Sequence, residues 1–165
     1  MSYLIREIKT DQKDLYKQFF SIGLNKDEEN FRTSVNDDRN AAFPTQDKPD
    51  SFTLGAYLND KLVGVVSFAR DGIDREKLRH KGVLVRMYVS EEHRVRGVGK
   101  NLINNLIARV KEIGNIEQIN LTVVSHNQSA ILLYESFGFK IFSTEMNAIK
   151  WKGKYFTENQ MVLML

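Results

Sequence analysis

The feature that most constrains this chain is a glycine-containing run, R-V-R-G-V-G at residues 94–99, which stands between two segments of different periodicity. Residues 83–90 before it, V-L-V-R-M-Y-V-S, are mostly apolar and β-branched, as is typical of a buried strand. After it, apolar residues recur at helical spacing over residues 97–113, and Gly114 provides a helix stop. The chain must therefore fold around a buried strand that ends in a glycine loop and continues directly into a long helix.

Strand-like and helix-like segments alternate in the middle of the chain, and hairpin patterns stand at both ends. Residues 52–58 and 62–69 are apolar runs separated by Asn59-Asp60-Lys61, which is typical of a hairpin turn. This order favours an α/β fold of mixed (α+β) type, with helices on the faces of a mixed sheet. The other expected segments are strands at 3–8, 118–124, 139–144 and 155–165, a helix after Asp11, one short helix in a long loop at 25–50, and a helix at 128–137.

The amino-acid composition excludes several classes of protein and of site. The chain has 165 residues, 42% hydrophobic and 27% charged, which is ordinary for a globular protein, so we expect a single domain over residues 1–165. Because cysteine is absent, a thiolate metal site, a cysteine nucleophile and a disulfide framework are excluded, and the cytoplasm is the expected compartment. The three histidines lack the i, i+4 spacing of a helical metal site, so we expect no metal.

Two kinds of partner are also disfavoured. The first residues, M-S-Y-L-I-R-E-I-K, carry charges early and no long apolar run, so we expect neither a signal peptide nor a membrane partner. The formal net charge is only +3, and basic residues gather between Arg70 and Lys100 without a long basic run. This asymmetry suits an anionic ligand better than a nucleic acid, and no helix-turn-helix or aromatic RNA-binding pattern accompanies it.

The loop at residues 94–99 has the composition of an anion site. Free backbone N–H groups and the positive end of the helix dipole meet where the helix begins. Gly97 and Gly99 let the backbone approach phosphate oxygens, while Arg94, Arg96 and Lys100 add positive charge. A tight turn before a helix uses the same residue types, so the loop alone leaves both interpretations open. The spacing matches neither the P-loop nor the dinucleotide-binding fingerprint.

The loop resembles the R/Q-x-x-G-x-G/A signature of the GCN5-related N-acetyltransferase (GNAT) superfamily, with Arg94, Gly97 and Gly99 at the signature positions. A second segment, N-Q-S-A-I-L-L-Y-E-S-F-G-F at residues 127–139, resembles the family's N-x-x-A-x-x-L-Y-x-x-x-G-F motif. The matched positions of this motif are Asn127, Ala130, Leu133, Tyr134, Gly138 and Phe139. Two motifs in the same order and spacing make the resemblance specific, and it extends from about residue 52 to the C-terminus.

The resemblance implies a fold and a coenzyme. The family has a mixed sheet of six or seven strands flanked by about four helices, and the sheet is splayed between its fourth and fifth strands. These strands correspond to residues 83–90 and 118–124, and the pantetheine of acetyl-CoA would lie in the split between them. Residues implied to contact the coenzyme are Met87, Tyr88, Val89, Arg94, Val95, Arg96, Gly97, Val98, Gly99, Lys100, Asn127 and Tyr134.

Two of these residues carry more than one interpretation. Asn127 stands just before a helix, so it either caps that helix or hydrogen-bonds the coenzyme, and both roles are compatible. Tyr134 lies seven residues later, about two turns along the same face. It resembles the family's tyrosine that protonates the departing thiolate as a general acid, and a tyrosine of the hydrophobic core is the alternative.

The general base is not evident from the sequence. An unperturbed amine has a pKa of about 10.4, so some group must remove a proton before the nitrogen can attack. Many family members use a glutamate in the fourth strand, but Val83 stands at that place and Arg86 is the only ionisable side chain of the strand. Glu145 is a candidate base, and the alternatives are the Glu91-Glu92 pair or a water chain to another carboxylate.

The resemblance therefore predicts direct transfer of an acetyl group from acetyl-CoA to a primary amine of a small molecule or peptide, without a covalent intermediate. A protein N-terminal or lysine acetyltransferase and a catalytically idle acyl-CoA-binding sensor are the alternatives. Acidic residues on the expected acceptor side would attract a cationic amine, although a solvated helix face explains them equally well; they are Asp27, Glu28, Glu29, Asp37 and Asp38. Residues 142–156 resemble bacterial members of the family, and a monomer or homodimer is expected.

Overall fold

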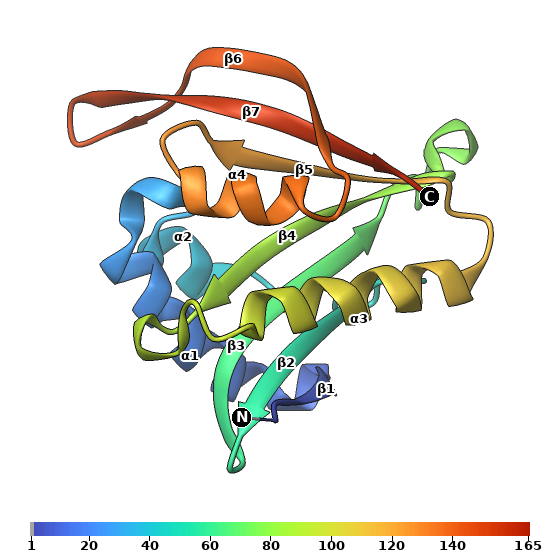
Figure 1. The fold of residues 1–165 in the computed structure, drawn as a ribbon, viewed down its shortest axis with the longest axis horizontal. Coiled ribbons are helices and arrows are strands. Elements are labelled where there is room, and N and C mark those ends of the chain that lie inside the picture. The colour runs from blue at the N-terminus through green and yellow to red at the C-terminus, as the bar shows by residue number, and fades with distance from the viewer. Residues whose placement is uncertain (1) are drawn as a thin grey trace.

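Seven strands form one mixed sheet in the computed structural model, which describes residues 2–165 (Figure 1). The strand order is β1-β2-β3-β4-β5-β7-β6, and all neighbours are antiparallel except β4 and β5, which are parallel. The strands are β1 (Leu4–Ile8), β2 (Phe52–Leu58), β3 (Lys61–Arg70), β4 (Lys81–Val89), β5 (Gln118–Val124), β6 (Lys140–Trp151) and β7 (Lys154–Met164). The expected mixed α/β architecture is confirmed.

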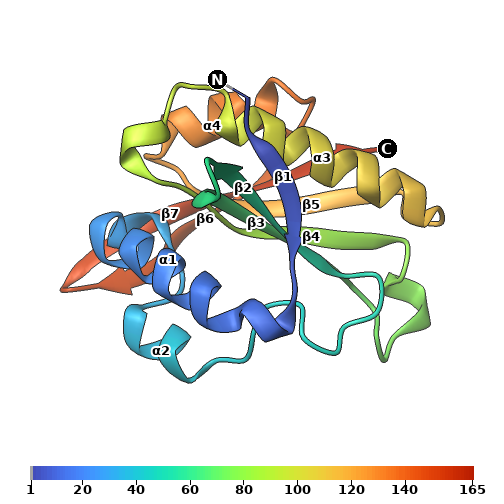
Figure 2. The ribbon, with the colours of Figure 1, turned by 90° about the horizontal axis from the view of Figure 1, so that it is seen from below.

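Within the described residues four α-helices flank this sheet, with α1 and α2 on one face and α3 and α4 on the other (Figure 2). They are α1 (Lys13–Lys26), α2 (Val35–Asn40), α3 (Val98–Ile113) and α4 (Gln128–Glu135), and short 3-10 helices stand at Thr10–Gln12, Glu28–Asn30 (η2), Glu76–Leu78 and Glu91–His93. Helix α3 buries Leu102, Leu106 and Val110 completely, at the i, i+4 spacing that the sequence predicts. Each such side chain contributes about 1.5–3 kcal/mol by its burial.

The sheet is splayed between β4 and β5, as the resemblance implies. The two strands share only three register pairs, from Lys81–Gln118 to Val83–Asn120. The rest of β5 pairs on its other edge with β7, from Gln118–Met164 to Val124–Glu158. Beyond Val83 the facing edges of β4 and β5 therefore have no strand partner, and we call this splay between the two halves of the sheet the slot.

A β-bulge in β4 begins where this slot begins. Tyr88 pairs with Val65 and Val85 pairs with Ser67, so two residues of β4, Arg86 and Met87, stand opposite one residue of β3. Arg86 has a φ of 54°, in the left-handed region that non-glycine residues seldom adopt. The bulge changes the side of the sheet to which the following side chains of β4 point.

Strand β6 differs most from the expectation of a strand at residues 139–144. It extends to Trp151, with an irregular register between Glu145 and Ile149. It is the edge strand of the sheet, and its side chains are mostly exposed, so no apolar alternation marks its second half. Helix α4 ends at Glu135, two residues before the expected end, ahead of a turn in which Gly138 has a φ of 94°.

The α3 core provides a direct test of the fold. Leu106→Ala should lower the free energy of unfolding by about 2–5 kcal/mol, because Leu106 is fully buried and its removal leaves a cavity. Leu132 on α4 is 63% exposed, so Leu132→Ala is the matched control. It should change the free energy of unfolding by only about 0.5 kcal/mol. Urea titrations followed by circular dichroism measure both, and equal losses would contradict this packing.

Candidate functional site

The glycine loop opens helix α3 and leaves its first N–H groups free. Gly97 is the N-cap residue, and no side chain caps the helix. The N–H of Asn101 donates to the Gly97 carbonyl at 3.0 Å, so the N–H groups of Val98, Gly99 and Lys100 precede the first intrahelical bond. The first turn carries no acidic residue. The positive end of a 16-residue helix is thus open to an anion.

The backbone of the loop contains left-handed residues that also favour an anion site. Val95 has a φ of 60° although it is β-branched, and its side chain is fully exposed. Gly97 has a φ of 85°, so Arg96 stands between two left-handed residues. Such alternation turns successive N–H groups toward one side and forms a concave anion site. The side chains of Arg96 and Lys100 are exposed and add positive charge around this concavity.

The two glycines of the loop are needed for different reasons. The φ of 85° at Gly97 favours glycine, and the space in front of it is open, because a Cβ there would meet nothing within 4 Å. A Cβ at Gly99 would lie 3.0 Å from Cδ2 of Leu133 and 3.2 Å from Cε of Met87. Gly99 is therefore explained by the close packing of α3 against α4 and β4 as well as by the expected approach of phosphate.

Arg94 lies against the end of α1. Its guanidinium pairs with the carboxylate of Asp27, the C-cap residue of α1, and stands 5.8 Å from the ring centroid of Tyr88. Its Nε donates to the carbonyl of Val89 at 3.1 Å. The carboxylate of Asp27 neutralises the charge of Arg94. Arg96 and Lys100 are therefore the cations of the loop that have no acidic partner in the described residues.

Beyond its three pairs with β5, the edge of β4 is open. The N–H of Ser90 donates to Val63 on β3 at 3.0 Å. Hydrogen-bonded and non-hydrogen-bonded pairs alternate along an antiparallel ladder, so the backbone groups of Val89 face the slot while those of Tyr88 face β3. Within the expected contact segment Met87, Tyr88 and Val89, the alternation therefore directs the N–H of Val89 toward a ligand in the slot, while its carbonyl already accepts from Arg94.

Asn127 begins the second motif as the N-cap residue of α4. Its Oδ1 accepts a hydrogen bond from the N–H of Ala130 at 3.3 Å and from the hydroxyl of Ser129 at 3.2 Å. The capping role is therefore present. Capping uses Oδ1 alone, so the side-chain NH₂ of Asn127 remains available to a ligand.

Tyr134 lies on the buried face of α4 and is 8% exposed. Its ring packs edge-on against Phe139, with 5.8 Å between the ring centroids. Burial raises the pKa of its phenol above the ordinary value of 10.0. No described residue forms a hydrogen bond with its hydroxyl, so this side chain belongs to the core and also keeps a proton that it can donate.

A strap of chain, residues 26–32, connects the two halves of the splayed sheet. Two of its contacts reach the segment after β4, and three reach β7, the β6–β7 turn and the start of α4. They are Lys26–Glu91 (3.3 Å), Asp27–Arg94, Glu28–Lys152 (2.8 Å), Asn30–His126 (3.1 Å) and Arg32–Glu158 (2.5 Å). The strap therefore crosses the mouth of the slot.

A pocket of about 540 Å³ lies between this strap and the start of α4. Its walls are residues 26–30 and 126–129. Three carboxylates line it, of which Asp27 pairs with Arg94 and Glu28 pairs with Lys152. Hydrogen bonds from Lys152 are the main cause of a lowered pKa of Glu28. Glu29 forms no ion pair with any described residue, so it is the uncompensated carboxylate of the pocket.

The ion pair between Arg32 and Glu158 is a feature that sequence reasoning missed. Glu158 lies on β7, opposite Val124 in the register, and is 2% exposed. Both of its oxygens accept from Arg32, at 2.5–2.9 Å. The two residues are 126 positions apart, and Glu158 stands in the polar run T-E-N-Q, so no local pattern marks it as buried.

The candidate bases lie in different places. Glu145 is within β6, not beyond the strand as expected, and it is exposed and directly opposite Glu158. Its charge helps to raise the pKa of Arg32, after the larger effect of Glu158. Glu91 pairs with Lys26, and Glu92 is exposed beside His93. Val83 occupies the last register pair of β4 with β5.

Two further features are absent from residues 2–165. This part of the chain brings together no group of three or more histidine or acidic side chains that would hold a metal ion. It also contains no helix with the length and apolar character needed to cross a membrane.

Known proteins resemble this chain in sequence. A family model described as the acetyltransferase (GNAT) family matches residues 12–139. A spermine/spermidine N(1)-acetyltransferase of Bacillus subtilis (strain 168) is 31% identical over 98 residues, which cover 57% of this chain and 62% of that protein. N-alpha-acetyltransferase 50 of Danio rerio is 30% identical over 95 residues, which cover 58% of this chain and 55% of that protein. The match thus spans less than two thirds of these curated relatives.

Solved structures share the fold over nearly the whole chain. A phosphinothricin acetyltransferase from Sinorhizobium meliloti, solved in complex with AcCoA, has a TM-score of 0.85 at 16% identity, covering 100% of this chain and 89% of that one. A putative acetyltransferase from Salmonella typhimurium, solved with its cofactor acetyl-CoA, has a TM-score of 0.83 at 18% identity, covering 99% and 94%. At these identities the likeness shows the fold.

Proposed function

The chain belongs to the acetyltransferase (GNAT) family, and we propose that it transfers an acetyl group directly from acetyl-CoA to a primary amine of a small molecule or peptide. The observation that carries this proposal is the slot between β4 and β5, at whose mouth the uncapped N-terminus of α3 lies. A slot with unpaired backbone edges that ends at an anion site suits a long, amide-bearing ligand with a pyrophosphate.

In this proposal the glycine loop holds the pyrophosphate of acetyl-CoA. The free N–H groups of residues 98–100 donate to its oxygens, and Arg96 and Lys100 supply charge. The N–H of Val89 on the open edge of β4 and the NH₂ of Asn127 bind the pantetheine amides. The coenzyme supplies the activated acetyl group, and the protein supplies its position.

The transfer itself needs an acid and a base. The amine nitrogen attacks the thioester carbonyl, the carbon–sulfur bond breaks, and the departing thiolate takes the proton of the Tyr134 phenol. The phenol is protonated at neutral pH, and burial raises its pKa further, so it holds a proton to give; the phenolate regains a proton from solvent after each turnover. The proton of the amine goes to Glu145, directly or through water. Glu145 is a better acceptor than Glu158, because Glu158 is held by two-pronged hydrogen bonding to Arg32.

The acceptor in this proposal is a cationic amine. The pocket under the strap has one uncompensated carboxylate, Glu29, beside two carboxylates that are already paired. Negative charge at a pocket mouth raises the local concentration of a cation. The printed names of the relatives, a polyamine acetyltransferase and an N-alpha-acetyltransferase, support polyamines and peptide N-termini as the first acceptors to try.

Val83 favours one alternative, a catalytically idle acyl-CoA-binding sensor, because no carboxylate stands at that place in β4. Thiol release from acetyl-CoA should separate the two, measured against spermidine, spermine, amino acids, aminoglycosides and N-terminal peptides. We expect release that depends on the acceptor, with polycationic amines giving the highest kcat/KM. Tight coenzyme binding by calorimetry without release on any acceptor would establish the sensor instead.

Tyr134→Phe should lower kcat by roughly a hundredfold while leaving the KM for acetyl-CoA unchanged, because it removes the proton donor and keeps the ring. Because the phenol pKa is raised above 10.0, loss of this acid should not reduce wild-type kcat until the pH exceeds that value. Tyr57→Phe is the matched control, since Tyr57 is also buried but lies on β2, outside the slot. A Tyr134→Phe enzyme with the wild-type rate would exclude this tyrosine as the acid.

Gly97→Glu should weaken coenzyme A binding by about 2 kcal/mol or more, about 30-fold, because its carboxylate would stand in the open space in front of the loop and repel phosphate. Gly153→Glu is the matched control. Gly153 lies in the β6–β7 turn, has a φ of 78° and also has nothing within 4 Å of a Cβ, so its backbone strain is comparable. Calorimetry measures binding, and thermal unfolding checks that both variants fold. Equal coenzyme affinities in the two variants would overturn the assignment of the loop.

A further inference from the structure

We propose that the buried ion pair between Asp38 of α2 and Arg86 of β4 is a positioning device for coenzyme binding. It holds the bulge of β4 in the form that lines the slot, and it ties that bulge to the acceptor side of the molecule. The inference rests on the proposed function, because it takes the slot beyond Arg86 as the coenzyme site.

The bulge determines to which side of the sheet the side chains of residues 87–89, which line the slot, point. In a regular strand residues four apart point to the same side of the sheet. Leu84 packs in the core on the α3 face, but Tyr88, four residues later, packs in the core on the α1 face. The ring of Tyr88 lies 5.3 Å from that of Phe19 on α1, between centroids. The extra residue of the bulge thus reverses the facing of the segment at residues 87–89.

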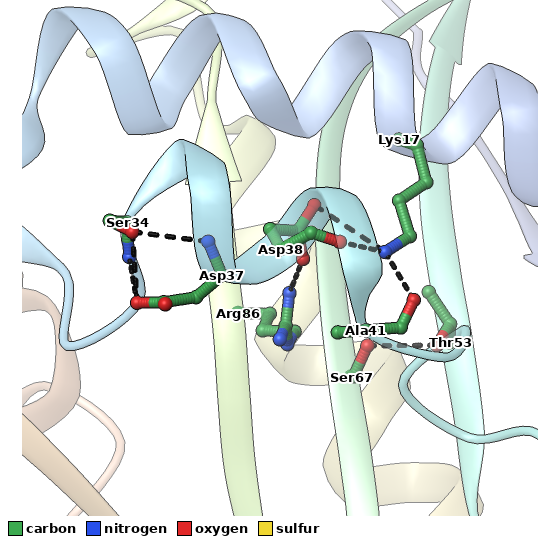
Figure 3. Close-up of polar contacts among 8 residues, drawn as sticks. All are labelled: Lys17, Ser34, Asp37, Asp38, Ala41, Thr53, Ser67 and Arg86. Atoms are coloured by element: carbon green, nitrogen blue, oxygen red, sulfur yellow. Dashed lines mark hydrogen bonds and ion pairs between the residues drawn. The ribbon is translucent and has the colours of Figure 1, made fainter.

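The conformation of Arg86 creates this reversal and needs support from outside the strand. A left-handed φ is strained for a residue with a Cβ, and such strain persists only where the surroundings fix it. The guanidinium of Arg86 pairs with the carboxylate of Asp38 (Figure 3). It also lies 5.4 Å from the ring centroid of Phe20. The side chains of Arg86 and Asp38 are 19% and 4% exposed. Removing Asp38 leaves the buried charge of Arg86 without its counterion, whereas the carboxylate of Asp38 also lies 3.7 Å from the Nζ of Lys17.

The partner of Arg86 is itself fixed by several contacts. Helix α2 has only six residues, too few to be stable alone, and it begins with a capping box of Ser34 and Asp37. Its C-terminal end is held by Lys17 of α1, whose Nζ donates to the carbonyl of Asp38 and, at 2.6 Å, to that of Ala41 (Figure 3). The carboxylate of Asp38 is therefore held between α1 and the bulge, and no other carboxylate pairs with Arg86 in the described residues.

This arrangement couples two sites. The strap and α2 lie on the acceptor side, and residues 87–89 line the coenzyme slot. A change that moves α2 changes the support of Arg86, and a ligand that stabilises the bulge stabilises α2 in return. Acceptor and coenzyme affinities are therefore linked through this one ion pair.

Asp38→Asn tests the proposal by removing the charge while keeping the shape of the side chain. We expect the dissociation constant for coenzyme A to rise roughly tenfold, within the usual range of coupling between sites. The KM for acetyl-CoA should rise in parallel, while kcat at saturating coenzyme stays close to the wild-type value. A merely structural role would lower the unfolding midpoint without this split between KM and kcat.

Asp50→Asn is the matched control. Asp50 pairs at 2.5 Å with Arg70, whose side chain is 5% exposed. Arg70 lies opposite Gly82, in the part of β4 that is paired with β5, and not at the bulge. The control should lose stability and keep its coenzyme affinity within about twofold. An unchanged dissociation constant in Asp38→Asn, or the same rise in Asp50→Asn, would overturn the proposal. A wild-type protein that binds no coenzyme A would refute the proposed function instead.

Two further variants decide the question even where Asp38→Asn does not fold. Asp38→Glu keeps a carboxylate for Arg86 and should bind coenzyme A within about threefold of wild type. Lys17→Met keeps both Asp38 and Arg86 but removes the support of α2 and the second, more distant counterion of Asp38. It should raise the dissociation constant in the same direction as Asp38→Asn but by less. Hydrogen exchange at residues 86–89 should be faster in Lys17→Met than in wild type. Unchanged exchange and affinity in Lys17→Met would show that α2 does not support the bulge.

Discussion

The incomplete pairing of β4 with β5 is the constraint on which the rest of this structure depends. Only three register pairs, ending at Val83–Asn120, join the two halves of the sheet. The facing edges beyond them carry backbone groups without strand partners, and such groups cost free energy unless something else satisfies them. Helices α3 and α4 pack across one face of the split, and the strap crosses its mouth. The fold thus maintains an opening that a fully paired sheet would close.

The sequence predicts elements well where burial follows a period. Strands β2 and β5 have the predicted bounds, and α3 begins and ends within a residue of the predicted helix, because each presents a regular apolar pattern to a core. Strand β6 lacks such a pattern, since its edge position leaves most side chains in solvent, and half of it was not predicted. An alternating apolar pattern appears in the sequence only where one face of a strand is buried. An exposed edge strand that is held by backbone pairing alone therefore shows no such pattern.

Some features of the candidate site could be predicted from the sequence and others could not. The loop at Gly97 and the cap at Asn127 are local motifs, and short spacings in the sequence specify them. The pairs Arg32–Glu158 and Asp38–Arg86 join residues 126 and 48 positions apart. Nothing near Glu158 or Asp38 in the sequence distinguishes them from solvated carboxylates. The topology of the sheet brings their cationic partners to them. These polar contacts around the slot can therefore be identified only once the fold is known.

The strap also gives the slot a sensitivity to ionic strength. Its outer pairs, Lys26–Glu91 and Glu28–Lys152, have at least one side chain more than half exposed, and screening at 0.1 M salt acts over about 10 Å. The Arg32–Glu158 pair has its carboxylate almost wholly buried and is screened far less. Rising salt therefore weakens Lys26–Glu91 and Glu28–Lys152 before it weakens Arg32–Glu158. The buried carboxylate of Glu158 therefore makes β7 the anchor of the strap that depends least on ionic strength.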